Sequence, residues 1–247
     1  MLFVDISSAY LIWSSKMHSQ NKNRGKYFRS PEQIKLVEQT VFGNVSVIQQ
    51  EQLPENININ NILKKLQICI PDHFVQNLDG IYIGTYDFLL KRDLNALYKD
   101  GAIYVLPEQD DEADVFDDIV HEIAHCVEET YGSDIYEDGS IEEEFARKRQ
   151  RLFDILRAYG YNEASETDFS NLDFSPKFDE YLYLMVGYPT LMQLTPNLFV
   201  SPYGATSLRE YFANCFEEYF ARRRYDNVRK VSPAVFDKIE ILLGQGY

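Results

Sequence analysis

Residues 115–127 have the sequence VFDDIVHEIAHCV, which contains the pattern His-Glu-x-x-His at positions 121–125. Apolar residues recur around this pattern at helical spacing, and this predicts an amphipathic helix. His121 and His125 are one helical turn apart, so both imidazoles point the same way. Two imidazole nitrogens in that arrangement can bind one zinc ion. The stretch therefore predicts a zinc site on a helix.

Glu122 directly follows the first of the two histidines. A bound zinc ion lowers the pKa of a coordinated water to about 7. A carboxylate next to a ligand is placed to take the proton from that water and pass it to a leaving amine. Glu122 is therefore the predicted general base. Asp117 or Asp118 could accept the second N–H of a ligand histidine, or they could simply form the acidic first turn of the helix.

A catalytic zinc site needs a third protein ligand and leaves its fourth position to water. The metzincin solution is excluded, because Glu128 stands where that pattern needs Gly and Tyr131 stands where it needs His. No histidine follows His125 anywhere in the chain. The third ligand is therefore expected to be a carboxylate.

Two acidic positions compete for this role. Glu143 and Glu144 belong to an acidic run that opens the next predicted helix, where they could instead complement the helix dipole and pair with basic residues after them. Glu210 lies further along the chain, three residues after Ser207. That spacing is also a capping-box pattern, which would only start a helix.

Besides His-Glu-x-x-His, the chain has Tyr203 and the sequence Glu-Tyr-Phe-Ala-Asn at 210–214. Through these motifs it resembles the catalytic domain of anthrax lethal factor and the related Pro-Pro endopeptidases. Those proteins are zincins. The resemblance implies that Glu210 is the third zinc ligand and that Tyr203, seven residues earlier, stabilises the oxyanion. It covers two short motif segments. Asn214 departs from it, since the family often has a second Glu there.

Other interpretations of the same motifs stay open. The pattern that begins at Glu210 is also faintly similar to zincins that cleave bacterial and phage repressors, although those usually place the Glu nearer the second His. A non-catalytic protein that keeps a zincin fold is a further alternative. Relatives of this architecture occur in toxins and in phage-encoded proteins, so a delivered or virion-associated protein fits as well.

The order of elements predicts an α+β fold of the zincin type. The first half indicates a small sheet with helices, and the second half is mostly helical, with the predicted active-site helix between them. Residues 31–247 are expected to form one domain with a helical insertion at about 141–195. In the first half we expect a helix-like piece before strand residues 45–47, a helix at 57–70, strands at 80–85 and 102–106, and irregular chain or a short helix at 86–99. In the second half we expect helices at 115–131, 141–158, 177–186, 208–224 and 233–243, the first three ended by glycines 132, 160 and 187.

Composition narrows the classes of function. The chain has 247 residues, 45% of them hydrophobic, and a net charge of −15. This length suits one substantial domain. An acidic chain repels phosphate, which argues against general nucleic-acid binding. No apolar run approaches the ~20 residues that a membrane span needs. Three scattered cysteines exclude a disulfide framework and fit a reducing compartment.

The N-terminal segment is distinct in charge. Met1 to Ser15 is apolar, but Asp5 precedes any basic residue, so no signal peptide is predicted and a cytoplasmic location is the default. Between Asp5 and Glu32 the charged residues are all basic. Residues 1–30 are therefore expected to form an arm, either a solvated loop or a docking segment for an acidic partner.

Overall fold

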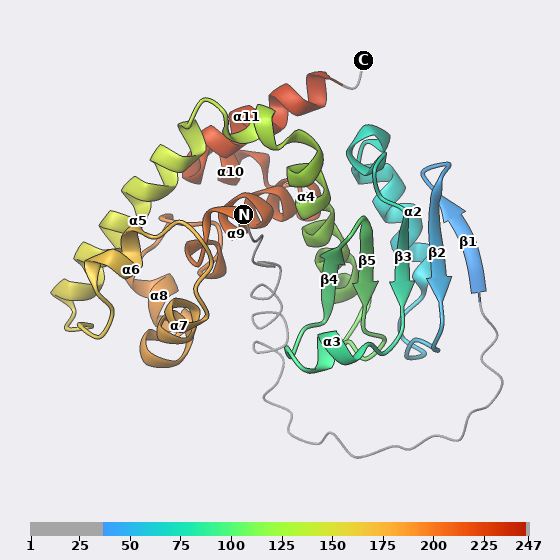
Figure 1. The fold of residues 1–247 in the computed structure, drawn as a ribbon, viewed down its shortest axis with the longest axis horizontal. Coiled ribbons are helices and arrows are strands. Elements are labelled where there is room, and N and C mark those ends of the chain that lie inside the picture. Colours follow the sequence, from blue (N-terminus) through green and yellow to red (C-terminus); the bar gives the residue numbers. More distant parts are fainter. Residues whose placement is uncertain (1–36, 246–247) are drawn as a thin grey trace. The chain divides into compact units, whose positions relative to one another are not determined.

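The structure is a computed structural model that describes residues 37–245 (Figure 1). These residues form two compact units, which meet in the sequence after Cys126. The N-terminal half carries a small five-stranded mixed sheet, and the C-terminal half is mostly helical, which confirms the predicted α+β class. The predicted arm at 1–30, with its basic segment, lies outside the described residues.

The sheet has the strand order β1-β2-β3-β5-β4 (Figure 1). The three central strands run parallel, and each edge strand is antiparallel to its neighbour. The predicted strands at 80–85 and 102–106 are β3 and β5. The strands are β1 (Val37–Val41), β2 (Val45–Gln49), β3 (Gly80–Ile83), β4 (Ala96–Lys99) and β5 (Ala102–Val105).

The helix-like piece expected before residue 45 is wrong over the described part of that stretch. Residues 37–41 form strand β1, which pairs with β2 in a hairpin. Phe42 and Gly43 have φ angles of 50° and 79°, and this left-handed pair turns the chain back on itself. The apolar spacing of a helix was coincidental there, because valine and threonine favour a pleated strand that has a partner.

Residues 86–99 contain more regular structure than expected. The short helix α3 (Asp87–Leu90) fits one of the two alternatives, but the edge strand β4 was missed. Ala96, Leu97 and Tyr98 are all buried, so β4 lacks the alternation of apolar and polar residues that marks a half-exposed strand in a sequence. Its pairing with β5 decides its conformation.

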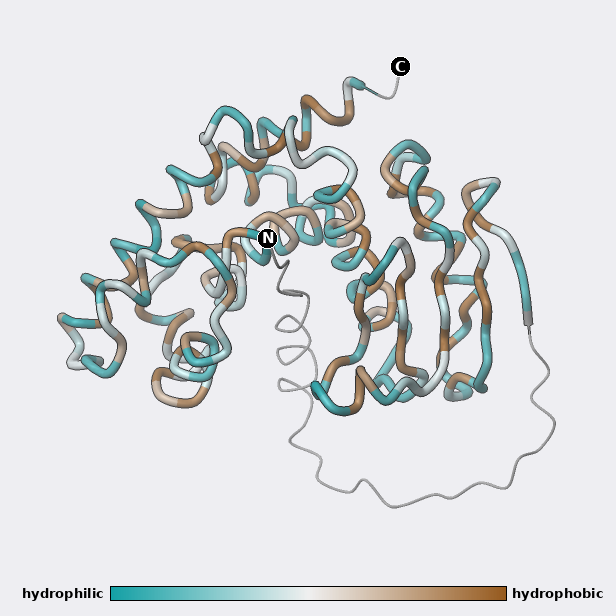
Figure 2. Tube along the Cα trace, in the orientation of Figure 1, coloured by the Kyte–Doolittle hydropathy of each residue, from teal (hydrophilic) through white to brown (hydrophobic). Residues whose placement is uncertain are grey.

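Helices α2 (Ile59–Cys69) and α4 (Glu112–Tyr136) belong to the same unit as the sheet, α4 with its first part. Helix α2 confirms the prediction at 57–70, and the short 3-10 turn η1 (Asp72–Val75) follows it. The start of α2 is tied to the start of α4, because Glu112 accepts hydrogen bonds from the Asn58 N–H and the Asn61 side-chain amide. Hydrophobic stretches run through the strands and through α4 (Figure 2). The bonds to Glu112, together with the Lys65 ammonium 3.6 Å from the centre of the Phe116 ring, hold the first half of α4 on α2.

Helix α4 starts at a side-chain cap and is broken near its predicted end. Asp111 accepts hydrogen bonds from the N–H groups of Ala113 and Asp114. The expected end of this helix at Tyr131 coincides with a break, because Tyr131 has a non-helical backbone (φ −115°, ψ 20°). A further helical segment, which was not predicted, then runs to Tyr136. The Tyr136 hydroxyl donates to the Glu128 carboxylate, and this bond holds the continuation against the preceding turns.

The regular elements of the second unit, over its described residues, are helices joined by loops. The predicted helices at 141–158 and 233–243 are confirmed, and the one at 208–224 ends earlier, at Phe220, because Arg223 adopts a positive φ of 53°. Every residue of α9 from 210 to 220 is buried, so this helix forms the centre of the unit. The elements are α5 (Ser140–Ala158), α6 (Glu166–Ser170), α7 (Pro176–Glu180), the π-helix η2 (Tyr181–Val186), α8 (Tyr188–Leu194), the 3-10 turn η3 (Tyr203–Ala205), α9 (Leu208–Phe220), α10 (Tyr225–Val231) and α11 (Pro233–Gly244).

The helix expected at 177–186 is present as two pieces. Helix α7 passes directly into the π-helix η2, and Gly187, with a φ of 83°, ends it as expected. Among the described residues, no helix combines the length and the apolar character that crossing a membrane requires.

Candidate metal centre

Helix α4 presents the His-Glu-x-x-His pattern as predicted. The rings of His121 and His125 have their centroids 5.0 Å apart and are inclined at 79°. His121 and Glu122 are fully buried, and His125 is 2% exposed. The apolar residues of this stretch, from Val115 to Val127, are buried as well. The histidines are therefore held in a water-poor surrounding, not on a solvated face.

Glu122 is anchored to the edge of the sheet. Its Oε2 accepts a hydrogen bond of 2.6 Å from the backbone N–H of Tyr98 in β4. A charge-assisted bond from a backbone amide fixes the orientation of the carboxylate. No side-chain pattern indicates this contact, because the donor is a main-chain group of β4, a strand that was not predicted.

Glu210 lies in the first turn of α9. Ser207 is the N-cap of this helix, and its hydroxyl accepts from the Glu210 N–H at 3.2 Å. The capping role that the sequence suggested for Ser207 is therefore present. The Glu210 side chain is fully buried, whereas a capping glutamate normally stays near solvent. A buried carboxylate is stable when its charge is paired or when it coordinates a metal ion.

His121, His125 and Glu210 form a group that can hold a metal ion. Each offers one ligand atom, and these three atoms lie within 4.8 Å of one another. Within residues 37–245, no other set of three or more His, Cys, Asp or Glu side chains brings its ligand atoms so close. In a tetrahedral zinc site with bonds of about 2.0–2.2 Å, ligand atoms are roughly 3.4 Å apart. Two imidazoles and one carboxylate, all buried, therefore suit such an ion after a small contraction.

The competing carboxylates have other partners. Glu144 is buried, and its two oxygens accept hydrogen bonds from the Tyr211 hydroxyl (2.7 Å) and the Ala234 N–H (3.1 Å). Glu143 is exposed, and its Oε2 lies 3.6 Å from Nη1 of Arg147, one turn further along α5. For Glu143 the structure bears out the predicted pairing with a basic residue that follows it. Glu144 is instead bound by a phenol of α9 and a backbone N–H of α11, which neither alternative included.

Tyr203 lies in η3, just before α9, and is fully buried. Its backbone oxygen accepts from both the N–H and the hydroxyl of Thr206. Gly204 packs on α9, since a Cβ there would lie at van der Waals distance, 3.5 Å, from Cβ of Asn214. Tyr203 is thus part of a tight turn fixed on the helix that carries Glu210.

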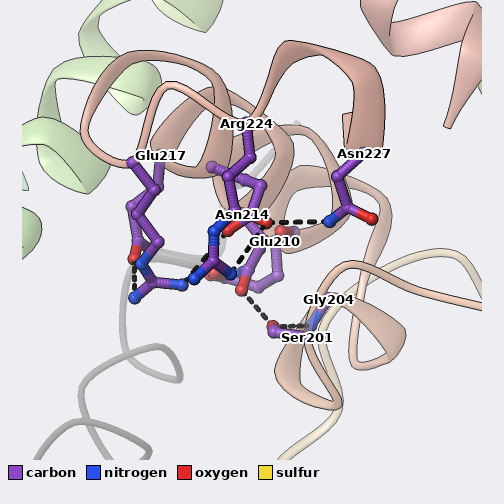
Figure 3. Close-up of polar contacts among 9 residues, drawn as sticks. Ser201, Gly204, Glu210, Asn214, Glu217, Arg224 and Asn227 are labelled. Atoms are coloured by element: carbon purple, nitrogen blue, oxygen red, sulfur yellow. Dashed lines mark hydrogen bonds and ion pairs between the residues drawn. The ribbon is translucent and has the colours of Figure 1, made fainter. Parts of the chain in front are cut away.

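Asn214, which departs from the resembled family, has a clear place (Figure 3). Its side-chain amide donates to the Glu210 backbone oxygen at 2.8 Å, and its Oδ1 accepts from the Ser201 hydroxyl. The same Ser201 oxygen accepts from the Gly204 N–H at 3.3 Å. Asn214 therefore links α9 to the turn that bears Tyr203, a partnership that sequence spacing did not reveal.

A buried polar pair lies close to Glu210 within the same unit. The Tyr188 hydroxyl donates to Asp179 at 3.0 Å, and both residues are almost completely buried. Burial, with the negative charges of Asp179 and Glu210 nearby, raises the pKa of Tyr188 well above its ordinary value. Tyr188 therefore stays a neutral hydrogen-bond donor. Among 18 tyrosines, no sequence signal singled it out.

Asp117 and Asp118, the acidic residues before His121 on α4, differ in burial. Asp118 is buried, while Asp117 is partly exposed, so only Asp118 has the enclosed position expected of a carboxylate that orients a ligand. Cys126 and Cys215 are fully buried and belong to the core.

The chain matches no protein-family model, no curated protein and no solved structure. Its function must therefore be argued from the chemistry of this group of residues.

Proposed function

We propose that the protein is a zinc-dependent endopeptidase of the zincin type, with Glu as the third zinc ligand. The observation that carries the proposal is the buried group of His121, His125 and Glu210, with Glu122 beside the first histidine on the same turn. A structural site would normally fill all four positions with protein ligands, whereas three protein ligands are typical of a catalytic zinc. The resemblance to the lethal factor family supports the same assignment.

The chain supplies a distinct group for each part of peptide hydrolysis. Zinc, when bound, would supply a Lewis acid that polarises a carbonyl and acidifies a water. Glu122 accepts the proton of the attacking water and delivers it to the leaving nitrogen. The Tyr98 N–H holds one oxygen of Glu122, so the carboxylate does not rotate between these two transfers. The phenolic hydroxyl of Tyr203 donates a hydrogen bond to the oxyanion.

The fold supports the proposal at the level of element order. A small mixed sheet precedes the helix with both histidines, and the third ligand follows on a later helix. The Glu122 bond to β4 couples the proposed base to the edge of that sheet. We therefore propose a zincin-like fold, in which the helices after α4 complete the metal site.

The substitution Glu122→Gln tests the proposal. It keeps the size and one acceptor oxygen of the side chain but removes the base. We expect cleavage of a mixed peptide library to fall by about 10²–10⁴-fold, because that is the usual contribution of a positioned acid–base group. Zinc content and thermal stability should be unchanged. Glu129→Gln is the matched control, since Glu129 is an exposed carboxylate on the same helix, and it should retain full activity.

Two results would overturn the proposal. One is a zinc-loaded wild type that cleaves no peptide in the library, which would favour a non-catalytic binding protein. The other is a Glu122→Gln variant that cleaves as fast as wild type, which would remove the base from the mechanism.

A further inference from the structure

The turn of residues 201–207 connects Tyr203 to the cap of α9, and a buried arginine from α5 reaches it. Nη1 of Arg149 donates to the backbone oxygens of Ala205 (2.9 Å) and Thr206 (3.2 Å). Nη2 donates to the backbone oxygen of Asp168 at 2.6 Å. Arg149 is 1% exposed, so these bonds are sheltered from water.

Burying a guanidinium is costly, and this one is compensated mainly by neutral groups. Its carbon lies 4.0 Å from the centre of the Phe178 ring, with the rings of Phe145 and Phe169 within 6 Å. Cation–π contacts of this kind stabilise a desolvated arginine. Burial lowers the pKa of Arg149 to about 9, the charge of Asp168 opposing this shift. The arrangement persists because the aromatic cage and the three carbonyls together replace water.

The two carbonyls that Arg149 binds lie in the chain between Tyr203 and Glu210. Ala205 is two residues after Tyr203, and Thr206 immediately precedes the cap Ser207. Asn214 holds the start of the same turn through Ser201, as Figure 3 shows. The turn is therefore fixed at both ends, by Asn214 at its beginning and by Arg149 at its end.

We infer that Arg149 is a positioning residue for the metal centre, acting through the 205–206 backbone to set the places of the Tyr203 hydroxyl and the Glu210 carboxylate. The inference rests on the proposed function. It gives the region expected to be a helical insertion at about 141–195 a specific task. Through Arg149, that region braces the turn between the proposed oxyanion donor and the third ligand.

A purely structural role makes a different prediction, because it would lower stability without changing the chemistry of the molecules that stay folded. Displacement of catalytic groups by about 1 Å can cost on the order of 10²-fold in rate. A positioning role therefore predicts a loss in kcat per folded molecule. It also predicts that this loss depends on Tyr203 being present.

The experiment compares Arg149→Met and Arg149→Lys with Arg151→Met, which removes an exposed arginine from the same helix. Each full-length variant is loaded with Co²⁺, and its visible absorption spectrum, which reports ligand geometry, is recorded below its melting temperature. Peptide cleavage is then measured with zinc, in wild type and in a Tyr203→Phe background. Arg149→Lys keeps a cation and covers the case in which Arg149→Met does not fold.

For Arg149→Met we expect an altered cobalt spectrum and a kcat lower by about 10–100-fold, with KM nearly unchanged. In the Tyr203→Phe background the further loss should shrink to about 3-fold or less, because the hydroxyl is already gone and only the displacement of Glu210 still lowers the rate. Arg149→Lys should be intermediate, since one ammonium cannot reproduce the planar fork. Arg151→Met should match wild type.

The inference is overturned if folded Arg149 variants keep the wild-type spectrum and kcat, or if they lose the same factor with and without Tyr203. In either case the wild type still binds metal and cleaves peptide, so the proposed function survives. A wild type that takes up no Co²⁺ and cleaves nothing refutes the proposed function itself.

Discussion

Helices α5 and α9 begin alike, with carboxylates in the first turn, yet their buried glutamates have different surroundings. Glu144 faces two hydrogen-bond donors, a phenol and the N–H of Ala234 in the first turn of α11. Glu210 is grouped with two imidazoles, whose nitrogens can act as lone-pair donors to a cation. A carboxylate opposite two donors is satisfied by the protein alone, whereas one grouped with two imidazoles can share a metal ion with them.

The helix starts differ in their caps as well. Helix α9 has Ser207 as its N-cap, with a side-chain bond to the Glu210 amide. The N-cap of α5 is Gly139, in a left-handed conformation (φ 70°) with no side-chain cap. The position of Glu210 is therefore fixed by its own helix start. That of Glu144 is fixed by partners from α9 and α11.

The largest stability effect should come from Glu144→Ala. The Tyr211 hydroxyl and the Ala234 N–H would both lose their acceptor in a buried place, so we expect a loss of about 3 kcal/mol in the free energy of unfolding. Urea denaturation in the presence of a chelator measures it without the contribution of a metal. Glu142→Ala is the control, because Glu142 is exposed on the same turn and should change little. A cost below about 1 kcal/mol for Glu144→Ala would mean that these bonds contribute little.

A smaller effect is expected at the cap of α9. Ser207→Ala removes the acceptor for the Glu210 N–H and should cost about 1 kcal/mol in unfolding free energy. It should also weaken zinc binding, measured by competition with a chromogenic chelator, because the first turn that carries Glu210 loosens. Ser207→Thr keeps a hydroxyl and should recover most of both losses. Equal zinc affinity in wild type and Ser207→Ala would separate the cap from the metal site.

The smallest effect belongs to Glu143. Its contact with Arg147 is solvent-exposed, and exposed i,i+4 ion pairs contribute at most about 0.5 kcal/mol. Glu143→Gln should therefore leave the thermal melting temperature, the zinc content and peptide cleavage close to wild type. A substantial loss of zinc in this variant would revive the acidic run of α5 as a ligand source.

Much of the arrangement could be predicted because its signals are local. The helical period around His121 and His125 indicated α4, and the apolar spacing with flanking glycine or proline indicated α2, α5 and α11. Short strands gave weaker signals. Strand β4 has four residues and is buried on both faces, and β1 was mistaken for a helix because its valines also fit a helical spacing.

The parts that could not be predicted depend on contacts far apart in the sequence. Glu144 meets Tyr211 across 67 positions and Ala234 across 90, so its motif alone left the ligand role open. Arg149 reaches the 205–206 turn across more than 50 positions. Glu122 receives its anchor from a main-chain amide, which no side-chain pattern can encode.

The most direct test of the account is the zinc content per chain of wild type, Glu210→Ala and Glu144→Gln, purified without chelators and measured by elemental analysis. We expect about one zinc per chain in wild type and in Glu144→Gln, and little in Glu210→Ala, because two imidazoles alone bind zinc weakly. Loss of zinc with Glu144→Gln and its retention with Glu210→Ala would contradict the ligand assignment. A wild type that neither contains zinc nor takes it up would contradict the metal centre.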